Sequence, residues 1–116
     1  MKIEITGYKN LNDDKLKEVN HGKKTILIGK IDGQYYAVSG KCTHLGCNLY
    51  KGQYHQGVIT CPCHGSKFKL INGKVLEWIG EWPNIVSKLT KLFGLEKDLQ
   101  TYEVFEEDDK LFIEVY

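Results

Sequence analysis

Alternating apolar and polar positions run through most of the chain and predict short β-strands. The segment KIEIT at 2–6 alternates charged and apolar residues, as a strand with one buried face does. The segment KKTILIGKIDGQYYAVS at 23–39 holds two apolar, β-branched or aromatic runs that meet at Asp32-Gly33, a pair typical of hairpin turns.

Five further segments complete the strand pattern. GVITC at 57–61 is strand-like, and KFKLI and KVLEWI at 67–71 and 74–79 flank Asn72-Gly73, the strongest short hairpin signal in the chain. QTYEVFE and KLFIEVY at 100–106 and 110–116 form a closing hairpin around the acidic turn 107–109. Short strands separated by turn signals predict an all-β fold, an antiparallel sandwich or barrel.

One segment has helical instead of strand periodicity. In PNIVSKLTKLFG at 83–94, apolar residues recur every three or four positions, Pro83 can open a helix and Gly94 can close it. We therefore expect one short helix near 84–93, packed on the sheet, with docking to a partner as the alternative. Trp78 and Trp82 are expected to anchor this segment.

Composition and charge narrow the function classes. A chain of 116 residues with 41% hydrophobic content is one globular domain, and no apolar run approaches a membrane span. The net charge of +1 gives no reason to expect nucleic acid as a partner, and we expect no membrane insertion and a monomer. Residues 1–60 hold nine lysines and five acids, whereas 61–116 hold seven lysines and ten acids. This asymmetry fits a solvated surface, or a dipolar protein that orients itself toward a partner.

The four cysteines lie between positions 42 and 63 and share that stretch with two histidines. The pattern is Cys42-x-His44 and, after sixteen residues, Cys61-x-x-His64. Two thiolates and two imidazoles on separate loops suit tetrahedral zinc, and equally an iron–sulfur cluster with two histidines on one iron. His21 and His55 lie outside this pattern and are expected to be exposed loop residues.

The segments CTHLGC at 42–47 (box I) and CPCHGS at 61–66 (box II) resemble the two boxes of Rieske [2Fe–2S] proteins, as found in cytochrome bc and b6f complexes. The neighbouring sequence from 33 to 68 is also similar to that family. The resemblance covers residues 22–70 well and the final hairpin loosely. It implies a Rieske-type β-sandwich or barrel, a single domain over 1–116, and a small cluster-binding subdomain at about 40–70.

The resemblance also implies a ligand set for a [2Fe–2S] cluster. In the family the first cysteine of each box binds one iron and the box histidines bind the other. On this chain that places Cys42 and Cys61 on one iron, and His44 and His64 on the second. The histidines bind through Nδ1, which leaves each Nε2–H toward solvent.

The second cysteines of the two boxes form a disulfide in the respiratory subgroup, which implies a Cys47–Cys63 bond. Local geometry agrees, because neighbouring side chains point to different sides, so Cys63 and His64 should not both face the cluster. Cys61, three residues before His64, can face it across a turn. Such a bond contributes roughly 3 kcal/mol in the chain-entropy model.

Three more residues acquire expected roles from the resemblance. Leu45 resembles the apolar shield over the cluster, with an ordinary core leucine as the alternative. Ser66 occupies the position of a hydroxyl that donates to a cluster sulfur and raises the potential. Phe68 stands where the highest-potential members have tyrosine, so we expect a potential above that of oxygenase-type ferredoxins and below that of quinol-oxidising subunits.

These inferences predict a soluble one-electron carrier of fairly high, pH-dependent potential rather than an enzyme, with unidentified redox proteins as donor and acceptor. The alternatives are the soluble part of a respiratory or oxidase-complex Rieske subunit, an oxygenase ferredoxin component, which would lack the disulfide pair, or a structural zinc module. Without an export signal we expect a cytoplasmic protein. A disulfide there is compatible with a thermophilic source; otherwise an export signal has been removed, or the two cysteines are reduced.

Overall fold

The structure of the chain is a computed structural model that describes residues 1–43, 46–63, 65–77 and 97–115. The helix expected at 84–93 lies outside the described residues. So do several other positions for which the sequence predicts a role, namely His44, Leu45, His64, Trp78 and Trp82.

The middle layer of the fold is a four-stranded antiparallel sheet in the order β2-β3-β4-β9. Its strands are β2 (Leu16–His21), β3 (Lys24–Ile31), β4 (Gln34–Ser39) and β9 (Thr101–Tyr102). The long apolar runs of β3 and β4 are explained by their burial on both faces. Leu27 and Val38 point to one side, and Ile26, Ile28 and Ala37 point to the other.

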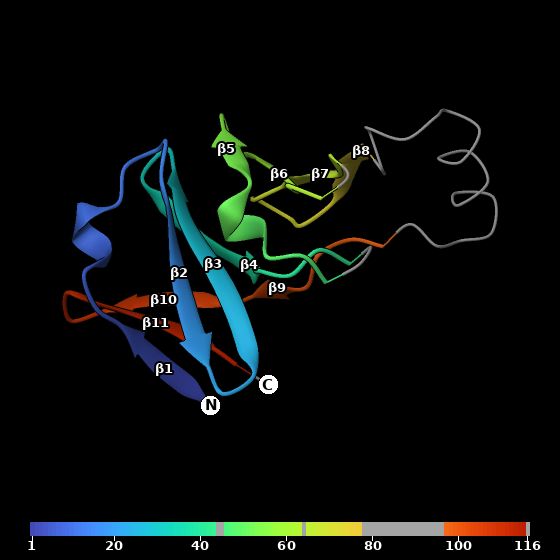
Figure 1. Cartoon of the computed structure of the whole chain (residues 1–116). Coiled ribbons are helices and arrows are strands. Elements are labelled where there is room, and N and C mark those ends of the chain that lie inside the picture. Colours follow the sequence, from blue (N-terminus) through green and yellow to red (C-terminus); the bar gives the residue numbers. More distant parts are fainter. Residues whose placement is uncertain (44–45, 64, 78–96, 116) are drawn as a thin grey trace, which may run out of the picture.

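A three-stranded sheet covers one face of the middle layer (Figure 1). Its order is β1-β11-β10, with β1 (Lys2–Ile5), β10 (Val104–Glu107) and β11 (Lys110–Glu114), and the short 3-10 helix η1 (Tyr8–Asn10) follows β1. The buried residues between the two sheets form what we call the hairpin-side core: Ile5, Tyr8, Ile26, Ile28, Ala37, Tyr102, Leu111, Ile113 and Val115.

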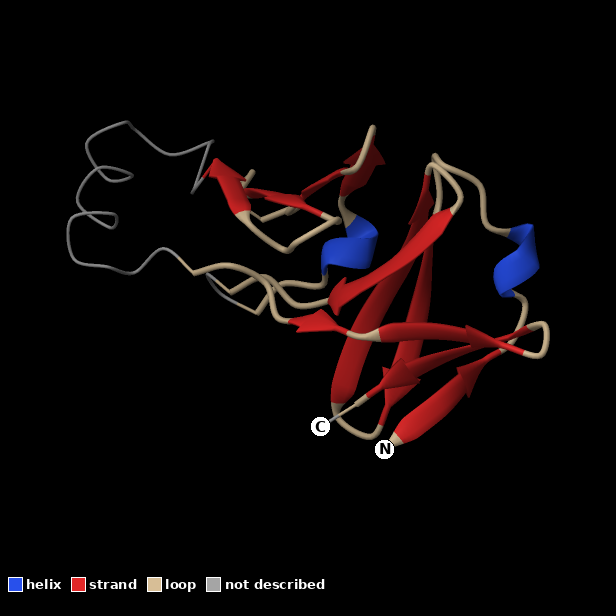
Figure 2. Ribbon diagram, turned by 180° about the vertical axis from the view of Figure 1, so that it is seen from behind, coloured by secondary structure: helices blue, strands red, loops and turns tan. Residues whose placement is uncertain are grey.

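A second four-stranded sheet lies on the other face of the middle layer (Figure 2). Its order is β5-β6-β7-β8, with β5 (Gln53–His55), β6 (Val58–Thr60), β7 (Lys67–Lys69) and β8 (Val75–Glu77), and the 3-10 helix η2 (Leu49–Lys51) leads into it. The buried residues on this side form the box-side core: Leu27, Val38, Cys42, Leu49, Ile59, Cys61, Phe68, Leu70 and Leu99.

The all-β antiparallel fold that the residue pattern predicts is confirmed. The β3–β4 hairpin turns at Asp32-Gly33, where both residues have positive φ (50° and 82°), as a two-residue turn requires. The segments around Asn72-Gly73 also pair, as β7 and β8, although their turn is longer and the register shifts at Lys67 and Phe68.

The expected single strand at 100–106 is wrong in one respect. Residues 101–102 pair with β4, and residues 104–107 pair with β11, so the chain passes from one sheet to another at Glu103.

Within the described residues, no helix is long and apolar enough to cross a membrane.

Candidate metal centre

The two cysteine boxes lie on two loops beside the box-side core. Box I follows β4 and leads into η2, and box II connects β6 to β7. Cys42 and Cys61, the first cysteines of the two boxes, are 3% and 2% exposed and belong to the same buried cluster. The fold therefore brings together the two thiols that the family resemblance assigns as ligands.

The two loops have the same backbone hydrogen bonds. In box I, the Cys42 N–H donates to the Cys47 carbonyl (2.8 Å) and the Gly46 N–H donates to the Cys42 carbonyl (2.8 Å). In box II, the Cys61 N–H donates to the Ser66 carbonyl (2.8 Å), and the Gly65 N–H donates to the Cys61 carbonyl (3.2 Å). Each loop thus closes on its own first cysteine.

Each closed loop needs a left-handed residue four positions after the cysteine. Gly46 and Gly65 have φ of 72° and 75°, a conformation in which glycine carries no steric penalty. Sequence reasoning did not identify these glycines, although the shared spacing C-x-x-x-G in both boxes is a readable signal. They are positioning residues for the cysteine side chains.

This equivalence changes how the boxes align. Counted from the first cysteine, Cys47 of box I corresponds to Ser66 of box II, and His44 corresponds to Cys63. The histidines of the two boxes therefore stand at different places in equivalent loops. The two loops share these backbone hydrogen bonds, and their sequences differ in which position carries the histidine.

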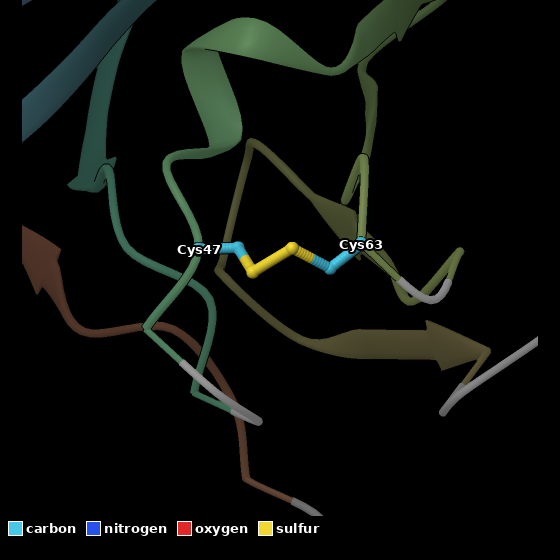
Figure 3. Close-up of a disulfide and its surroundings, with 2 residues drawn as sticks. All are labelled: Cys47 and Cys63. Atoms are coloured by element: carbon cyan, nitrogen blue, oxygen red, sulfur yellow. A yellow bond between two sulfur atoms is a disulfide. The ribbon is translucent and has the colours of Figure 1, made fainter.

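A disulfide joins the two loops (Figure 3). It links Cys47 to Cys63, whose Cα atoms are 6.5 Å apart, and confirms the pairing that the resemblance implies. The Sγ atoms of Cys47, Cys61 and Cys63 all lie within 4.8 Å of one another. The cross-link is therefore in direct proximity to one of the proposed ligands.

Box I is also anchored to two other parts of the fold. The Thr43 hydroxyl donates to the carbonyl of Lys97 (2.7 Å), on the segment that enters β9. The Asn48 side-chain amide donates to Glu18 Oε2 (3.1 Å) on β2, and the Asn48 Oδ1 accepts from the Tyr50 N–H (3.0 Å) at the start of η2. These contacts fix the loop from both of its ends.

The residues expected to tune the site are buried on the same side. Ser66 is 0% exposed, and Phe68, on β7, is also 0% exposed within the box-side core. Their burial means that a hydroxyl at either position would act in a low-dielectric environment, where hydrogen bonds are strong.

Tyr54, on β5, has an unusual environment. Its hydroxyl is buried and has no hydrogen-bond partner within the described part of the chain. Burial raises the pKa of Tyr54, and the negative charges of Asp13 and Asp14 raise that pKa further. The side chain lines a cleft of about 510 Å³ between β5, η2 and the segment that enters β2.

The donor set fits a thiolate-bound metal centre. The disulfide removes Cys47 and Cys63 from the possible thiolate donors, which leaves Cys42 and Cys61 as the two buried thiols that could bind a metal. Two thiolates are what both a mixed Cys/His zinc site and a two-histidine iron–sulfur cluster require. The other two donors of the predicted set, His44 and His64, lie outside the described residues.

The remaining two histidines lie at strand ends, so their expected placement in loops is wrong. His21 is the half-buried last residue of β2, and His55 is the exposed last residue of β5.

Comparison with known proteins identifies the family. The sequence model of the Rieske [2Fe–2S] domain matches residues 2–103. The chain is 33% identical over 72 residues to apoptosis-inducing factor 3 of Homo sapiens, which covers 62% of this chain and 12% of that protein. It is 42% identical over 66 residues to the cytochrome b6-f complex iron-sulfur subunit of Chlorobaculum tepidum, which covers 53% of this chain and 30% of the relative.

The chain thus spans well under half the length of both relatives. Among solved structures, the Sphingomonas yanoikuyae B1 ferredoxin superposes over 100% of both chains with a TM-score of 0.76 and 21% identity, which supports the shared fold. Two buried thiols on equivalent, disulfide-linked loops and a family match over most of the sequence lead to one conclusion. The chain belongs to the Rieske [2Fe–2S] domain family.

Proposed function

We propose that this chain is a soluble one-electron carrier with a fairly high, pH-dependent reduction potential. A bound [2Fe–2S] cluster supplies one-electron redox chemistry. The observation that carries the proposal is the pair of buried thiols, Cys42 and Cys61, on loops with the same hydrogen-bond pattern and a disulfide between them.

The proposed ligands are Cys42 and Cys61 for one iron, and His44 and His64 for the other. Neutral imidazoles in place of two thiolates make the site less negative, which favours a potential between about −150 and +300 mV. The disulfide and the closed loops hold the two thiols in fixed positions. Leu45 is proposed to exclude water from the same site.

Two residues are proposed to set the potential within that range. The buried Ser66 hydroxyl favours the reduced state if it donates to a cluster sulfur, because it stabilises added negative charge. Phe68 lacks the hydroxyl that would add a second donor. The potential is therefore proposed to lie above that of oxygenase-type ferredoxins and below that of quinol-oxidising subunits.

The proposed pH dependence arises at the imidazoles. His44 and His64 each hold a proton at Nε2, and negative charge added beside them favours the protonated rings. The potential is therefore expected to be constant at low pH and to fall by ~59 mV per pH unit for each proton lost in the alkaline range.

A redox titration of the purified protein between pH 5 and pH 11, followed by visible absorption and electron paramagnetic resonance, tests this function. We expect a coloured protein, equal amounts of iron and inorganic sulfide, a rhombic signal after reduction and a potential that falls at alkaline pH. A colourless protein that contains zinc would contradict the proposal. A potential independent of pH would contradict the assignment of the imidazole protons.

A second candidate is the soluble part of a quinol-oxidising Rieske subunit. The disulfide and the 42% identity to the cytochrome b6-f subunit favour it. A potential near the upper end of the family range, with reduction by a hydroquinone, would support this candidate over a free carrier. The same disulfide disfavours an oxygenase ferredoxin component.

The remaining features of the protein are also proposals. We propose a carrier rather than an enzyme, because one-electron transfer needs an exposed ligand edge and no bond-making residues. The donor and acceptor are proposed to be redox proteins. A single domain over 1–116 with a cluster-binding subdomain at about 40–70, a monomeric state, a cytoplasmic location and a thermophilic source stay predictions.

A further inference from the structure

The surface around the two boxes is strongly basic. Residues 33–76 contain five lysines and not one aspartate or glutamate. All five lysines are exposed, and Lys97, also exposed, is held against box I by the hydrogen bond from Thr43 to its carbonyl. We call this set the basic end: Lys41, Lys51, Lys67, Lys69, Lys74 and Lys97.

Three of these lysines lie immediately beside the proposed ligands. Lys41 precedes Cys42 in the chain, and the backbone of Lys97 contacts box I. Lys51 lines a recess of about 310 Å³ together with Cys61 and its neighbour. A partner that approaches the box loops therefore meets positive charge beside both boxes.

Two acids that contact this region, Glu18 and Asp98, are already engaged by it. Glu18 accepts the hydrogen bond from the Asn48 amide, and Asp98 Oδ1 accepts one from the Val75 N–H (2.9 Å). Both carboxylates thus have a structural role next to the box-side core. Further acids lie nearby, since Glu77 is opposite Lys67 in the β7–β8 register and Asp14 lines the cleft beside η2, but the exposed lysines of the basic end are more numerous.

The opposite end of the molecule is acidic. The end of β10 and the turn that follows it carry four consecutive exposed acids at 106–109, of which Glu107 is ion-paired with Lys2 (3.1 Å). This turn lies at the far end of the fold from the β5–β8 sheet (Figures 1 and 2). Asp108 and Asp109 form this turn with positive φ (52° and 62°), and both residues are exposed. With a net charge of only +1, the protein is a dipole rather than a uniformly basic particle.

We propose that the basic end docks on an acidic protein surface that surrounds the redox centre of the partner. Charge separation along the molecule turns the box loops toward a negative surface before contact, and such steering raises association rates at low salt. This inference rests on the proposed function, because docking at the boxes matters only if electrons pass there.

Voltammetry of the cluster-loaded protein on gold electrodes tests the docking surface. A carboxylate-terminated monolayer stands in for the acidic partner, and an ammonium-terminated monolayer attracts the acidic turn instead. At ~10 mM ionic strength we expect electron transfer at least about tenfold faster on the carboxylate surface. At ~0.5 M salt, screening should remove most of the difference.

Charge-reversal variants locate the effect. The pair Lys41→Glu and Lys51→Glu should slow transfer on the carboxylate surface about tenfold. The control pair Lys9→Glu and Lys110→Glu changes the net charge equally but lies beside the acidic turn, so it should leave the carboxylate rate within about twofold.

Equal rates on the two electrodes, or equal effects of the two variant pairs, would overturn the docking proposal. A mediated redox titration in solution distinguishes failure of the docking proposal from failure of the proposed function, because it detects a redox-active cluster without any docking surface. A further outcome would also contradict the inference: equal rates on the two electrodes, and sedimentation with phosphatidylglycerol vesicles that depends on the lysines. The basic end would then bind a lipid surface and not an acidic protein.

Discussion

Phe68 is the residue at which one added oxygen atom should change the reduction potential most. Its ring is fully buried in the core that also contains Cys42 and Cys61. We predict that Phe68→Tyr raises the reduction potential by roughly 50–100 mV, because a new hydrogen bond worth about 1.4 kcal/mol more in the reduced state corresponds to ~59 mV for one electron. A potentiometric titration at pH 7 measures the shift.

The matched control makes the same chemical change in another sheet. Phe112→Tyr adds a hydroxyl on β11, which packs in the sheet on the opposite side of the middle layer, and should leave the potential unchanged. An unchanged or lowered potential in the Phe68 variant would show that position 68 does not reach the redox site.

Substitution of Tyr54 should change the unfolding free energy of the protein and not its reduction potential. Its buried hydroxyl has no hydrogen-bond partner in the described part of the chain, so Tyr54→Phe removes a buried polar group that is left unsatisfied. We predict a gain of about 1 kcal/mol in unfolding free energy at pH 7. Urea unfolding measures it, and Tyr50→Phe, at an exposed neighbour, should change stability by less than about 0.5 kcal/mol.

The same substitution should alter the response to alkali. The pKa of Tyr54 is raised in the folded protein, so below the ordinary value of about 10 its ionisation does not reduce the unfolding free energy. As pH rises from there through the folded value, the unfolded chain loses the proton more readily, and the unfolding free energy of the unmodified protein falls. The stability advantage of Tyr54→Phe should therefore widen above pH ~10. An advantage that stays constant between pH 7 and pH 11 would contradict this assignment.

At the level of single residues, the chemistry of the boxes could be predicted and their geometry could not. Cysteine and histidine types and their spacing indicated a metal site, and the family resemblance implied which residues are the donors and which cysteines form the disulfide. The equivalence of the two loops was hidden because Cys47 corresponds to Ser66, and the histidines occupy different offsets. Backbone hydrogen bonds at Gly46 and Gly65 define that equivalence, and residue types do not report them directly.

The two box loops should depend on their cross-link to keep the cluster. The disulfide closes a loop with a sequence separation of 16, for which the chain-entropy model gives roughly 3 kcal/mol. We predict that the double variant Cys47→Ser and Cys63→Ser still binds the cluster but loses its visible absorbance at least about tenfold faster on heating. Absorbance decay at a fixed temperature measures the rate.

Cys61→Ser provides the comparison for that experiment. It removes a proposed ligand instead of the cross-link and should abolish the cluster signal altogether. A double variant that bleaches at the rate of the unmodified protein would show that the closed loops hold their geometry without the disulfide.

The junction between η2 and β5 is a second element that positions the boxes. A Cβ atom at Gly52 would overlap the Thr60 carbonyl and would lie 3.0 Å from the Pro62 ring, next to Cys61. We predict that Gly52→Ala costs about 1–3 kcal/mol and broadens the paramagnetic signal of the reduced protein, because the box II backbone must shift.

Gly22→Ala is the control for that change. Gly22 has open space around it, although its φ of 62° adds strain of about 1 kcal/mol to any side chain there. It should reduce stability without changing the signal. An unchanged signal in the Gly52 variant would show that this contact supports the fold alone.

Elements with strong patterns could be predicted, and those whose pairing is decided by tertiary contacts could not. β2 has one packed apolar residue for each face, Leu16 toward the box-side core and Val19 toward the hairpin-side core, so its sequence shows no clear alternation. β5 has only three residues. The division of 100–106 depends on which sheet accepts each half, and local sequence carries no such information.

The whole molecule is organised by the doubly buried middle sheet. One face of β3 and β4 supports the cysteine boxes, and the other packs on the sheet that carries the acidic turn. This arrangement places the basic end and the acidic turn on opposite sides of the middle sheet. The order of charges along the chain suggested a dipole, but only the stacking of the sheets assigns its positive end to the boxes.

This layering predicts different outcomes for two neighbouring residues of β3. Leu27 and Ile28 are both 0% exposed, but Leu27 lies in the box-side core and Ile28 in the hairpin-side core. Truncation of either side chain to alanine should cost about 2–5 kcal/mol in unfolding free energy. Only Leu27→Ala should also accelerate cluster loss, because its cavity opens beside Cys42 and Cys61.

Parallel measurements of unfolding and of absorbance decay separate the two effects. At temperatures chosen so that both variants are equally far below their unfolding midpoints, Ile28→Ala should bleach as slowly as the unmodified protein, and Leu27→Ala should bleach faster. Equal bleaching rates would mean that the two cores respond as one unit. The middle sheet would then transmit packing defects from the hairpin side to the boxes instead of isolating them.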